Sequence, residues 1–294
     1  MRFAKKITEM ILYMVVCYSI HQIYSVDTPA CVIQFKHTQT QGDHAKTIMY
    51  DQTIKKLHEM ISRSKRIVFF GGAGVSTACG IPDFRSADGL YSDQFGLAGR
   101  SPEDILSALF FALHTGEFYD FYRARMVYPD AQPGAVHRYL YELEKQDRLR
   151  GIVTQNIDGL HKRAGNKRVY ELHGSIYENC CVDCEAEYPL EKITGCEGVP
   201  RCDRCGGIIK PYVVLYGEAP DKYTMIGATR EISNADMLIV AGTSLQVEPA
   251  ASLIDCFDGR YLVVINKEET PADSRASLII HNDIEKVFSE LEKM

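Results

Sequence analysis

Six of the ten cysteines lie between Cys180 and Cys205. They include two Cys-x-x-Cys pairs, Cys181 with Cys184 and Cys202 with Cys205, and seventeen residues separate the pairs. This spacing is typical of a zinc ribbon, in which four thiolates surround the metal. Two disulfides are the weaker alternative, because disulfide frameworks belong mainly to short secreted chains. We therefore predict that Cys181, Cys184, Cys202 and Cys205 hold zinc, while Cys180 and Cys196 have no assigned role.

The predicted zinc is structural, because four thiolate ligands leave no open position for water or substrate. A zinc nucleobase deaminase would carry a glutamate two residues after its histidine ligand, and Ser175 stands there after His173. His173 is therefore expected to stay off the metal and to be available for acid–base chemistry. The alternative for an isolated histidine here is a side chain hydrogen-bonded into the core.

A glycine-rich segment, Gly71–Thr77 (GGAGVST), follows the apolar run Arg66–Phe70 (RIVFF). Glycines between a buried strand and a helix let backbone N–H groups approach a phosphate, although they also occur in plain tight turns. A dehydrogenase would add an acidic residue about 20 residues further on to bind the ribose, and no clear candidate is present. An ordinary NAD dehydrogenase therefore fits poorly.

Two further polar segments could contact a nucleotide. Cys79–Ser86 (CGIPDFRS) carries charged residues and an aromatic side chain that could cover a flat ring. Thr154–His161 (TQNIDGLH) places two amides and a carboxylate after a short apolar run. Such groups need a ligand or each other when they are buried, with helix capping as the alternative. His161 itself is expected to be a packed or surface side chain.

Short apolar runs alternate with helical patterns along the chain. The runs are Arg66–Phe70, Ile152–Val153, Val169–Leu172, Met237–Ala241 and Leu262–Ile265, and the helical patterns are Asp51–Ser62, Ser101–His114, Pro133–Lys145 and Asp283–Lys293. This alternation predicts an α/β fold with a doubly wound, Rossmann-like parallel sheet. Ligands of such sheets bind at the carboxyl ends of the strands, where the polar segments lie.

The chain has 294 residues, a net charge of −6 and no long run of Lys or Arg, so we expect no binding to nucleic acid. A basic start and the apolar run Ile7–Ile20 (ITEMILYMVVCYSI) resemble a signal peptide. The run is shorter than the roughly 20 residues of a spanning helix, and Glu9 interrupts it. With export as the alternative, we expect a cytoplasmic protein without stable membrane insertion.

Together these segments resemble the sirtuins, NAD-dependent protein-lysine deacylases. The resemblance is carried by GAGVSTACGIPDFRS (72–86), TQNIDGLHKRAG (154–165), ELHGS (171–175), the two Cys-x-x-Cys pairs, IIKPYVVLYGE (208–218), GTSLQVEPA (242–250) and VVINKEET (263–270). It implies a Rossmann-like NAD-binding domain over residues 50–175 and 211–294, with a helical module. It further implies a small zinc domain over 176–210, and residues 1–48 form an extension outside it.

The resemblance also implies roles for individual residues. His173 would be the general base, with Asn156 as the second catalytic residue. NAD would be contacted by Ala73, Thr77, Phe84, Arg85, Gln155, Ile157, Asp158, His173, Thr243, Ser244, Asn266, Asp283 and Ile284. An acetyl-lysine protein or peptide would bind as an added strand between Val214–Glu218 and Gln246–Glu248. Its carbonyl oxygen would attack the nicotinamide ribose, and the products would be lysine, nicotinamide and O-acetyl-ADP-ribose.

The chain departs from the family pattern in its acyl site. Leu215-Tyr216 replaces a more aromatic pair, and Tyr122 stands where succinyl-preferring sirtuins carry arginine three residues after a tyrosine, here Tyr119. Tyr122 is itself followed three residues later by Arg125, in a register shifted from that of the family. We therefore expect a deacetylase. The alternatives are a desuccinylase or other deacylase, a protein ADP-ribosyltransferase, and a non-catalytic zinc-ribbon binding module.

Overall fold

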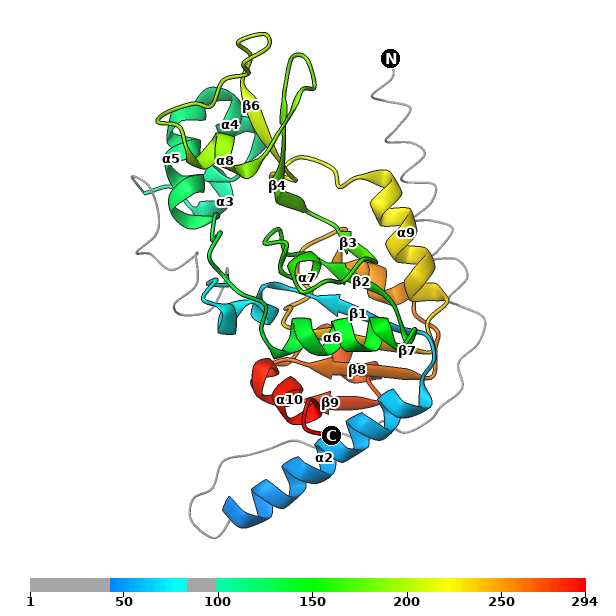
Figure 1. The fold of residues 1–294 in the computed structure, drawn as a ribbon. Helices are drawn as coiled ribbons and strands as arrows, with labels where there is room; N and C mark the ends of the chain where they lie inside the picture. Colours follow the sequence, from blue (N-terminus) through cyan, green and yellow to red (C-terminus); the bar gives the residue numbers. More distant parts are fainter. Residues whose placement is uncertain (1–42, 84–98) are drawn as a thin grey trace. The chain divides into compact units, whose positions relative to one another are not determined.

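The computed structural model describes residues 43–83 and 99–294 of the chain. Its centre is a six-stranded parallel sheet with the order β3-β2-β1-β7-β8-β9 (Figure 1). The strands are β1 (Ile67–Gly71), β2 (Leu149–Thr154), β3 (Val169–Glu171), β7 (Met237–Ala241), β8 (Tyr261–Ile265) and β9 (Leu278–Ile280). The chain winds outward in one direction from β1 and in the other from β7, so the order reverses between these two strands. The predicted doubly wound sheet is confirmed.

Helices cover both faces of this sheet (Figure 1). Ile67 and Phe69 of β1 pack into one apolar cluster with α2 (Asp43–Arg63), α6 (Ala135–Lys145) and α10 (Ile284–Leu291). Val68 and Phe70 pack into the opposite cluster with α9 (Lys222–Ser233) and the short 3₁₀ helices η3 (Ala251–Cys256) and η4 (Pro271–Arg275). Successive strand residues point to opposite faces, which explains why β1 and β7, buried on both faces, are continuous apolar runs.

A second, antiparallel sheet has the order β5-β4-β6. Its strands are β4 (Gly174–Cys181), β5 (Glu187–Tyr188) and β6 (Ile209–Val213). They share an apolar cluster with α8 (Leu190–Thr194) of the cysteine-bearing segment and with the helical module, formed by α3 (Pro102–Ile105), α4 (Ala108–Leu113) and α5 (Thr115–Arg125). The helical module and the cysteine-bearing segment therefore have one common core. The exact domain boundaries given above remain a prediction.

Two of the expected helices differ in extent. The helix expected at Asp51–Ser62 begins at Asp43, because neither glycine nor proline interrupts the chain between Asp43 and Arg63. The helix expected at Ser101–His114 is broken into α3 and α4. The Ser107 Oγ atom accepts a hydrogen bond from the Phe110 backbone N–H at 3.1 Å and so caps a new helix, which ends the first one.

Two 3₁₀ turns, η1 (Ala73–Val75) and η2 (Thr77–Cys79), begin within the glycine-rich segment. A Cβ atom on Gly72 would lie 2.6 Å from the carbonyl oxygen of Gly242, and a Cβ atom on Gly74 would lie 2.8 Å from the Cα atom of Gly242. The glycines thus let the loop after β1 pack directly on the loop after β7. This close contact forms the floor of the region where the strand order reverses.

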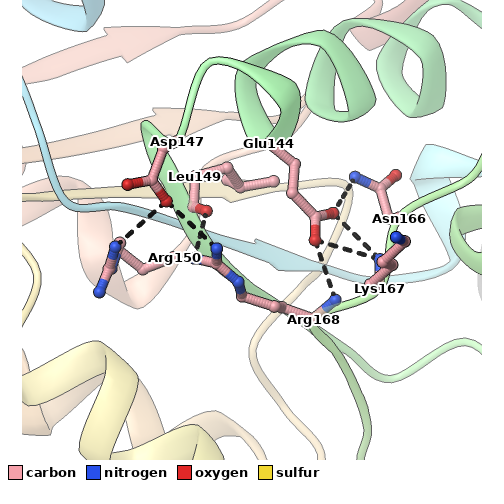
Figure 2. A network of polar contacts seen from close by, with 7 residues as sticks. All are labelled: Glu144, Asp147, Leu149, Arg150, Asn166, Lys167 and Arg168. Carbon is pink, nitrogen blue, oxygen red and sulfur yellow. Dashed lines mark hydrogen bonds and ion pairs between the residues drawn. The ribbon is translucent and has the colours of Figure 1, made fainter.

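A polar network holds β3 in place at the end of the sheet remote from these loops (Figure 2). The Glu144 carboxylate of α6 accepts hydrogen bonds from Asn166 Nδ2 at 2.8 Å and from the backbone N–H groups of Lys167 and Arg168, each at 3.2 Å from Oε1. Arg168 also contacts Asp147 at 3.1 Å. These contacts fix the entry to β3, the strand that His173 follows.

Within the two described ranges, no helix combines the length and the apolar character needed to cross a membrane.

Candidate active site

A cavity of about 700 Å³ lies at the carboxyl ends of the parallel strands. Its walls come from the segments that follow β1, β2, β7 and β8, from the start of α10, and from residues 213–218. This is the expected position for a ligand, because loops diverge where the strand order reverses and leave a crevice. The volume is within the range of small-molecule and cofactor sites.

Most of the residues predicted to contact NAD line this cavity. They are Ala73, Thr77, Gln155, Asn156, Ile157, His173, Thr243, Ser244, Asn266, Asp283 and Ile284. Asp158 does not line the cavity and acts on it through Ser76. Phe84 and Arg85 lie outside the described residues. The structure thus brings together segments separated by more than two hundred positions.

One ring nitrogen of His173 is hydrogen-bonded to the protein backbone. Its Nδ1 atom lies 3.0 Å from the carbonyl oxygen of Gln155. Because a carbonyl can only accept a hydrogen bond, Nδ1 carries the proton and Nε2 has the free lone pair. Burial lowers the pKa of His173 below its usual value, and the bond to Gln155 offsets only part of that lowering. The imidazole is therefore neutral at pH 7 and is a proton acceptor at Nε2.

The backbone on either side of His173 joins the two sheets. The His173 carbonyl accepts a hydrogen bond from the Val214 N–H at 2.9 Å. Gly174 has φ +77°, and a Cβ atom there would lie 1.9 Å from the Tyr212 carbonyl oxygen. Only glycine allows this approach, which explains the Gly that follows the histidine in ELHGS.

Asn156 is oriented by a buried hydroxyl. Its Nδ2 atom donates to Ser76 Oγ at 3.0 Å, and Ser76 Oγ donates to Asp158 Oδ2 at 2.7 Å. Asp158 also accepts from the Leu160 N–H at 2.9 Å. Burial raises the pKa of Asp158, and these hydrogen bonds counteract that effect. The hydrogen bonds that link Asp158, Ser76 and Asn156 therefore set the direction of the Asn156 side-chain amide in the cavity.

Gln155 offers a donor that the protein does not use. Its Nε2 atom is buried and has no hydrogen-bond partner among the described residues, while Thr243 Oγ1 donates to its Oε1 at 3.4 Å. A buried donor of this kind costs free energy unless a ligand accepts its hydrogen bond. The cavity therefore fits an oxygen-rich ligand such as NAD.

At the other end of the cavity, the loop after β8 meets the start of α10. Asn266 Nδ2 donates to the Glu268 carbonyl at 2.8 Å. Asp283 caps α10 by accepting from the Lys286 N–H at 3.2 Å and pairs with Lys267 at 3.0 Å. Burial raises the pKa of Asp283, but the contacts with Lys267 and the helix start outweigh it and lower the pKa. The Asp283 carboxylate thus stays ionised.

The sulfur atoms of Cys181, Cys184, Cys202 and Cys205 lie within 4.8 Å of one another. Neighbouring sulfurs are 3.4–3.5 Å apart, far longer than the ~2.05 Å of a disulfide. Tetrahedral Zn–S bonds of about 2.3 Å place ligand sulfurs about 3.8 Å apart, so the four thiols fit a closed zinc site. Tyr188 donates its hydroxyl to Cys202 Sγ at 3.0 Å and accepts from the Asp203 N–H at 2.9 Å, which orients this ligand.

Sequence reasoning missed Ser76 and Tyr122. Ser76 lies inside the GAGVST segment, beside the predicted contact Thr77. The signal that marks it is its burial, since only 1% of the residue is exposed, and burial became known only from the structure. Tyr122 was considered only for its spacing from Tyr119. The structure shows that Tyr122 lines the cavity and that Tyr119 does not.

Comparisons with known proteins agree with this geometry. The model of the Sir2 family matches residues 72–249. An NAD-dependent protein deacetylase of Clostridium perfringens is 51% identical over 242 residues, which cover 82% of this chain and 99% of the relative. An NAD-dependent protein deacetylase of Cutibacterium acnes is 48% identical, and the match covers 82% of this chain and 98% of that relative.

Solved structures give the same result. A Sir2 complex with p53 peptide and NAD⁺ superposes with a TM-score of 0.72 at 36% identity, covering 82% of this chain and 97% of that one. A Sir2 homologue in complex with NAD has a TM-score of 0.73 at 37% identity, covering 81% and 92%. With the sheet, the cavity and the four-cysteine cluster in place, the chain belongs to the Sir2 family, the sirtuins.

Proposed function

We propose that this protein is an NAD-dependent protein-lysine deacetylase that releases nicotinamide and O-acetyl-ADP-ribose. The observation that carries the proposal is the neutral His173, whose Nε2 atom has no hydrogen-bond partner among the described residues and belongs to a cavity lined by strand-end residues. The relatives named above carry the same activity in their names. NAD, when bound, supplies the ribose carbon that takes up the acyl oxygen as nicotinamide leaves.

The residues of the chain act on that reaction by binding, orienting and accepting a proton. We assign His173 Nε2 as the acceptor of a ribose hydroxyl proton, which requires the neutral imidazole that burial favours. Asn156, directed by Ser76, is assigned to the nicotinamide end of the cavity. Gln155 Nε2 donates to a cofactor oxygen, and this bond removes the cost of leaving it unpartnered.

The substrate peptide is assigned to the mouth of the cavity, between Val214–Glu218 and Gln246–Glu248. Most residues of both segments line the cavity. The first segment is held in shape by Glu218, whose Oε2 atom accepts from the Leu215 N–H at 2.9 Å and from Lys210 Nζ at 3.0 Å. An extended peptide can bind between two such backbone segments through main-chain hydrogen bonds.

The four cysteines are assigned to one structural zinc ion. Thiolates bind zinc only while they are reduced, so this site favours a reducing compartment, and we propose that the enzyme acts in the cytoplasm.

The test is the product of the reaction. The purified protein should consume NAD only when an acetyl-lysine peptide is present, and mass spectrometry should find O-acetyl-ADP-ribose in equal amount to the free lysine formed. Transfer of ADP-ribose to the peptide, with the acetyl group retained, would instead indicate an ADP-ribosyltransferase. NAD consumption without any acyl peptide would also contradict the proposal.

A further inference from the structure

A second hollow lies at the opposite edge of the parallel sheet, where the strands begin. Its volume is about 610 Å³, within the range of small-molecule sites. Its walls come from the segment 230–236 at the end of α9, from the segment 258–260 before β8, and from the starts of β1 and β2. None of its lining residues lines the cavity of the candidate active site. The lining of this separate site includes four arginines, Arg66, Arg150, Arg230 and Arg260.

The register of the sheet places two of these arginines. Arg66 directly precedes β1 and Arg260 directly precedes β8, while Asp236 precedes β7, the strand between them. The Asp236 N–H donates to the Arg66 carbonyl at 3.0 Å, and the Arg260 N–H donates to the Asp236 carbonyl at 3.1 Å. Neighbouring strands lie about 4.8 Å apart, so the backbones of the two arginines are about 10 Å apart. Both positions are therefore fixed by the backbone before any ligand binds.

The guanidinium groups of Arg66 and Arg260 carry charge that no carboxylate neutralises. Arg66 Nε donates to the Asn234 carbonyl at 2.7 Å, which holds this guanidinium at the end of α9. The Arg260 guanidinium lies over the Tyr261 ring, 4.7 Å from its centroid. Over residues 43–83 and 99–294, neither group forms an ion pair with a carboxylate. The terminal nitrogens of both side chains are thus available to an anionic ligand.

The acidic side chains of the lining are engaged elsewhere or exposed. Asp236 accepts hydrogen bonds from two backbone N–H groups at the start of β1, at 2.9 and 3.0 Å, so its oxygens face the backbone. Glu231 accepts from Arg230 at 3.3 Å. Asp258, the third acid, is exposed. Four arginines and three carboxylates line the hollow, so its formal charge is positive, although the chain as a whole carries −6.

Arg150 adds to this positive charge. Its guanidinium shares one carboxylate, that of Asp147, with Arg168, at distances of 3.4 and 3.1 Å (Figure 2). One carboxylate cannot neutralise two guanidinium groups. The network beside the hollow therefore contributes further positive charge to this edge of the sheet.

We propose that the hollow binds a polyphosphate group carried by a small molecule, such as a nucleoside triphosphate or inorganic tripolyphosphate. A guanidinium binds phosphate oxygens through two parallel N–H···O bonds and keeps its charge at physiological pH. A linear polyphosphate offers oxygens to Arg66 and Arg260 at once, and their fixed backbones lower the ordering cost of binding. The volume of the hollow favours such a ligand over an acidic segment of a protein partner.

The experiment is a calorimetric titration of the full-length protein with sodium tripolyphosphate, at low ionic strength and with NAD in excess. Arg66→Gln and Arg260→Gln should each raise the Kd by about tenfold to a hundredfold, because each loses charged hydrogen bonds. Arg260→Lys keeps the charge without the fork of donors, and its Kd should lie between those of the wild type and Arg260→Gln. Arg63→Gln is the charge-matched control, since Arg63 is exposed, pairs with Glu59 and lies outside the hollow.

Arg66 and Arg260 are exposed, so their variants should keep the melting temperature of the wild type. No measurable binding to the wild type would overturn the inference. An equal rise of the Kd in Arg63→Gln would also overturn it, because tripolyphosphate would then respond only to net charge. Binding that appears only when NAD is left out would place the anion in the other cavity. Tighter binding of a hexaglutamate peptide than of tripolyphosphate would contradict the proposed ligand class. None of these measurements depends on the deacetylase activity.

Discussion

His173 Nδ1 and the carbonyl oxygen of Gln155 lie 3.0 Å apart, and this contact decides which ring nitrogen faces the cavity. The carbonyl belongs to the residue directly after β2, and the histidine follows β3, which pairs with β2. The parallel pairing of two strands therefore sets both the position and the tautomer of the proposed base.

His173→Ala should abolish turnover while the fold and the zinc remain, because the side chain lines the cavity and is not one of the four zinc ligands. In the wild type, kcat/KM should fall on the acid side as Nε2 becomes protonated. Since burial lowers the pKa, that fall should occur below pH 6.5, the usual value for histidine. His114→Gln, which removes a half-buried histidine outside the cavity, is the matched control. Measurable turnover by His173→Ala at any pH would argue against a base role.

Ser76→Ala should uncouple Asn156 from Asp158. Both partners lose a hydrogen bond inside the protein, so we expect kcat/KM to fall about 10- to 100-fold and the free energy of unfolding to drop by about 1–3 kcal/mol. Steady-state kinetics and urea denaturation would measure the two effects. Ser233→Ala, which removes a hydroxyl bonded to the Thr229 carbonyl on α9, should change neither kinetic constant. Unchanged kinetics in Ser76→Ala would show that Asn156 does not need this contact.

Cys181→Ser should lose zinc and unfold the antiparallel sheet, because the ligand is 1% exposed inside the core that this sheet shares with the helical module. Metal analysis and the melting temperature would measure this loss, and activity should fall as a consequence. The adjacent Cys180→Ser offers a close control and should keep a full complement of zinc. A zinc-free Cys181→Ser protein with normal activity would refute a structural role of the metal.

Stability should decline on acidification because two buried histidines resist protonation. His137 and His161 have ring centroids 4.6 Å apart, and neither ring nitrogen of His161 has a partner among the described residues. Burial lowers the pKa of His137 to about 4 and that of His161 well below its usual value. The unfolded chain binds these protons near pH 6.5 and the folded chain does not, so the free energy of unfolding falls as the pH drops from about 6.5 toward 4.

His161→Leu should flatten this dependence and should not lower stability at pH 7, since an apolar side chain of similar size replaces an unpartnered imidazole. Urea denaturation at pH 7.0, 6.0 and 5.0 would give the slopes. The same slope in the wild type and in the variant would contradict the prediction.

Local patterns in the sequence determined five of the six parallel strands and the spacing of the four predicted zinc ligands, but neither β9 nor the strands of the antiparallel sheet. The runs that became β1 and β7 are continuous apolar segments because both of their faces are buried, and that property can be recognised without knowing the neighbours. The two Cys-x-x-Cys pairs likewise encode a metal site in short-range spacing. The polar segments after the strands could be assigned to one edge of the sheet because parallel strands bring their ends together.

Only the tertiary structure decided how residues from distant segments combine. Ser76 and Asp158 are 82 positions apart, and their hydrogen bond exists because β1 and β2 are neighbours in the sheet. Gly72 and Gly74 could be read as phosphate-binding residues, yet their contact is with Gly242 on another loop. Tyr119 and Tyr122 are equivalent in a sequence, and packing alone assigns one hydroxyl to a backbone carbonyl and leaves the other buried without a partner among the described residues. Such pairings depend on which surfaces meet after folding, and no local spacing specifies them.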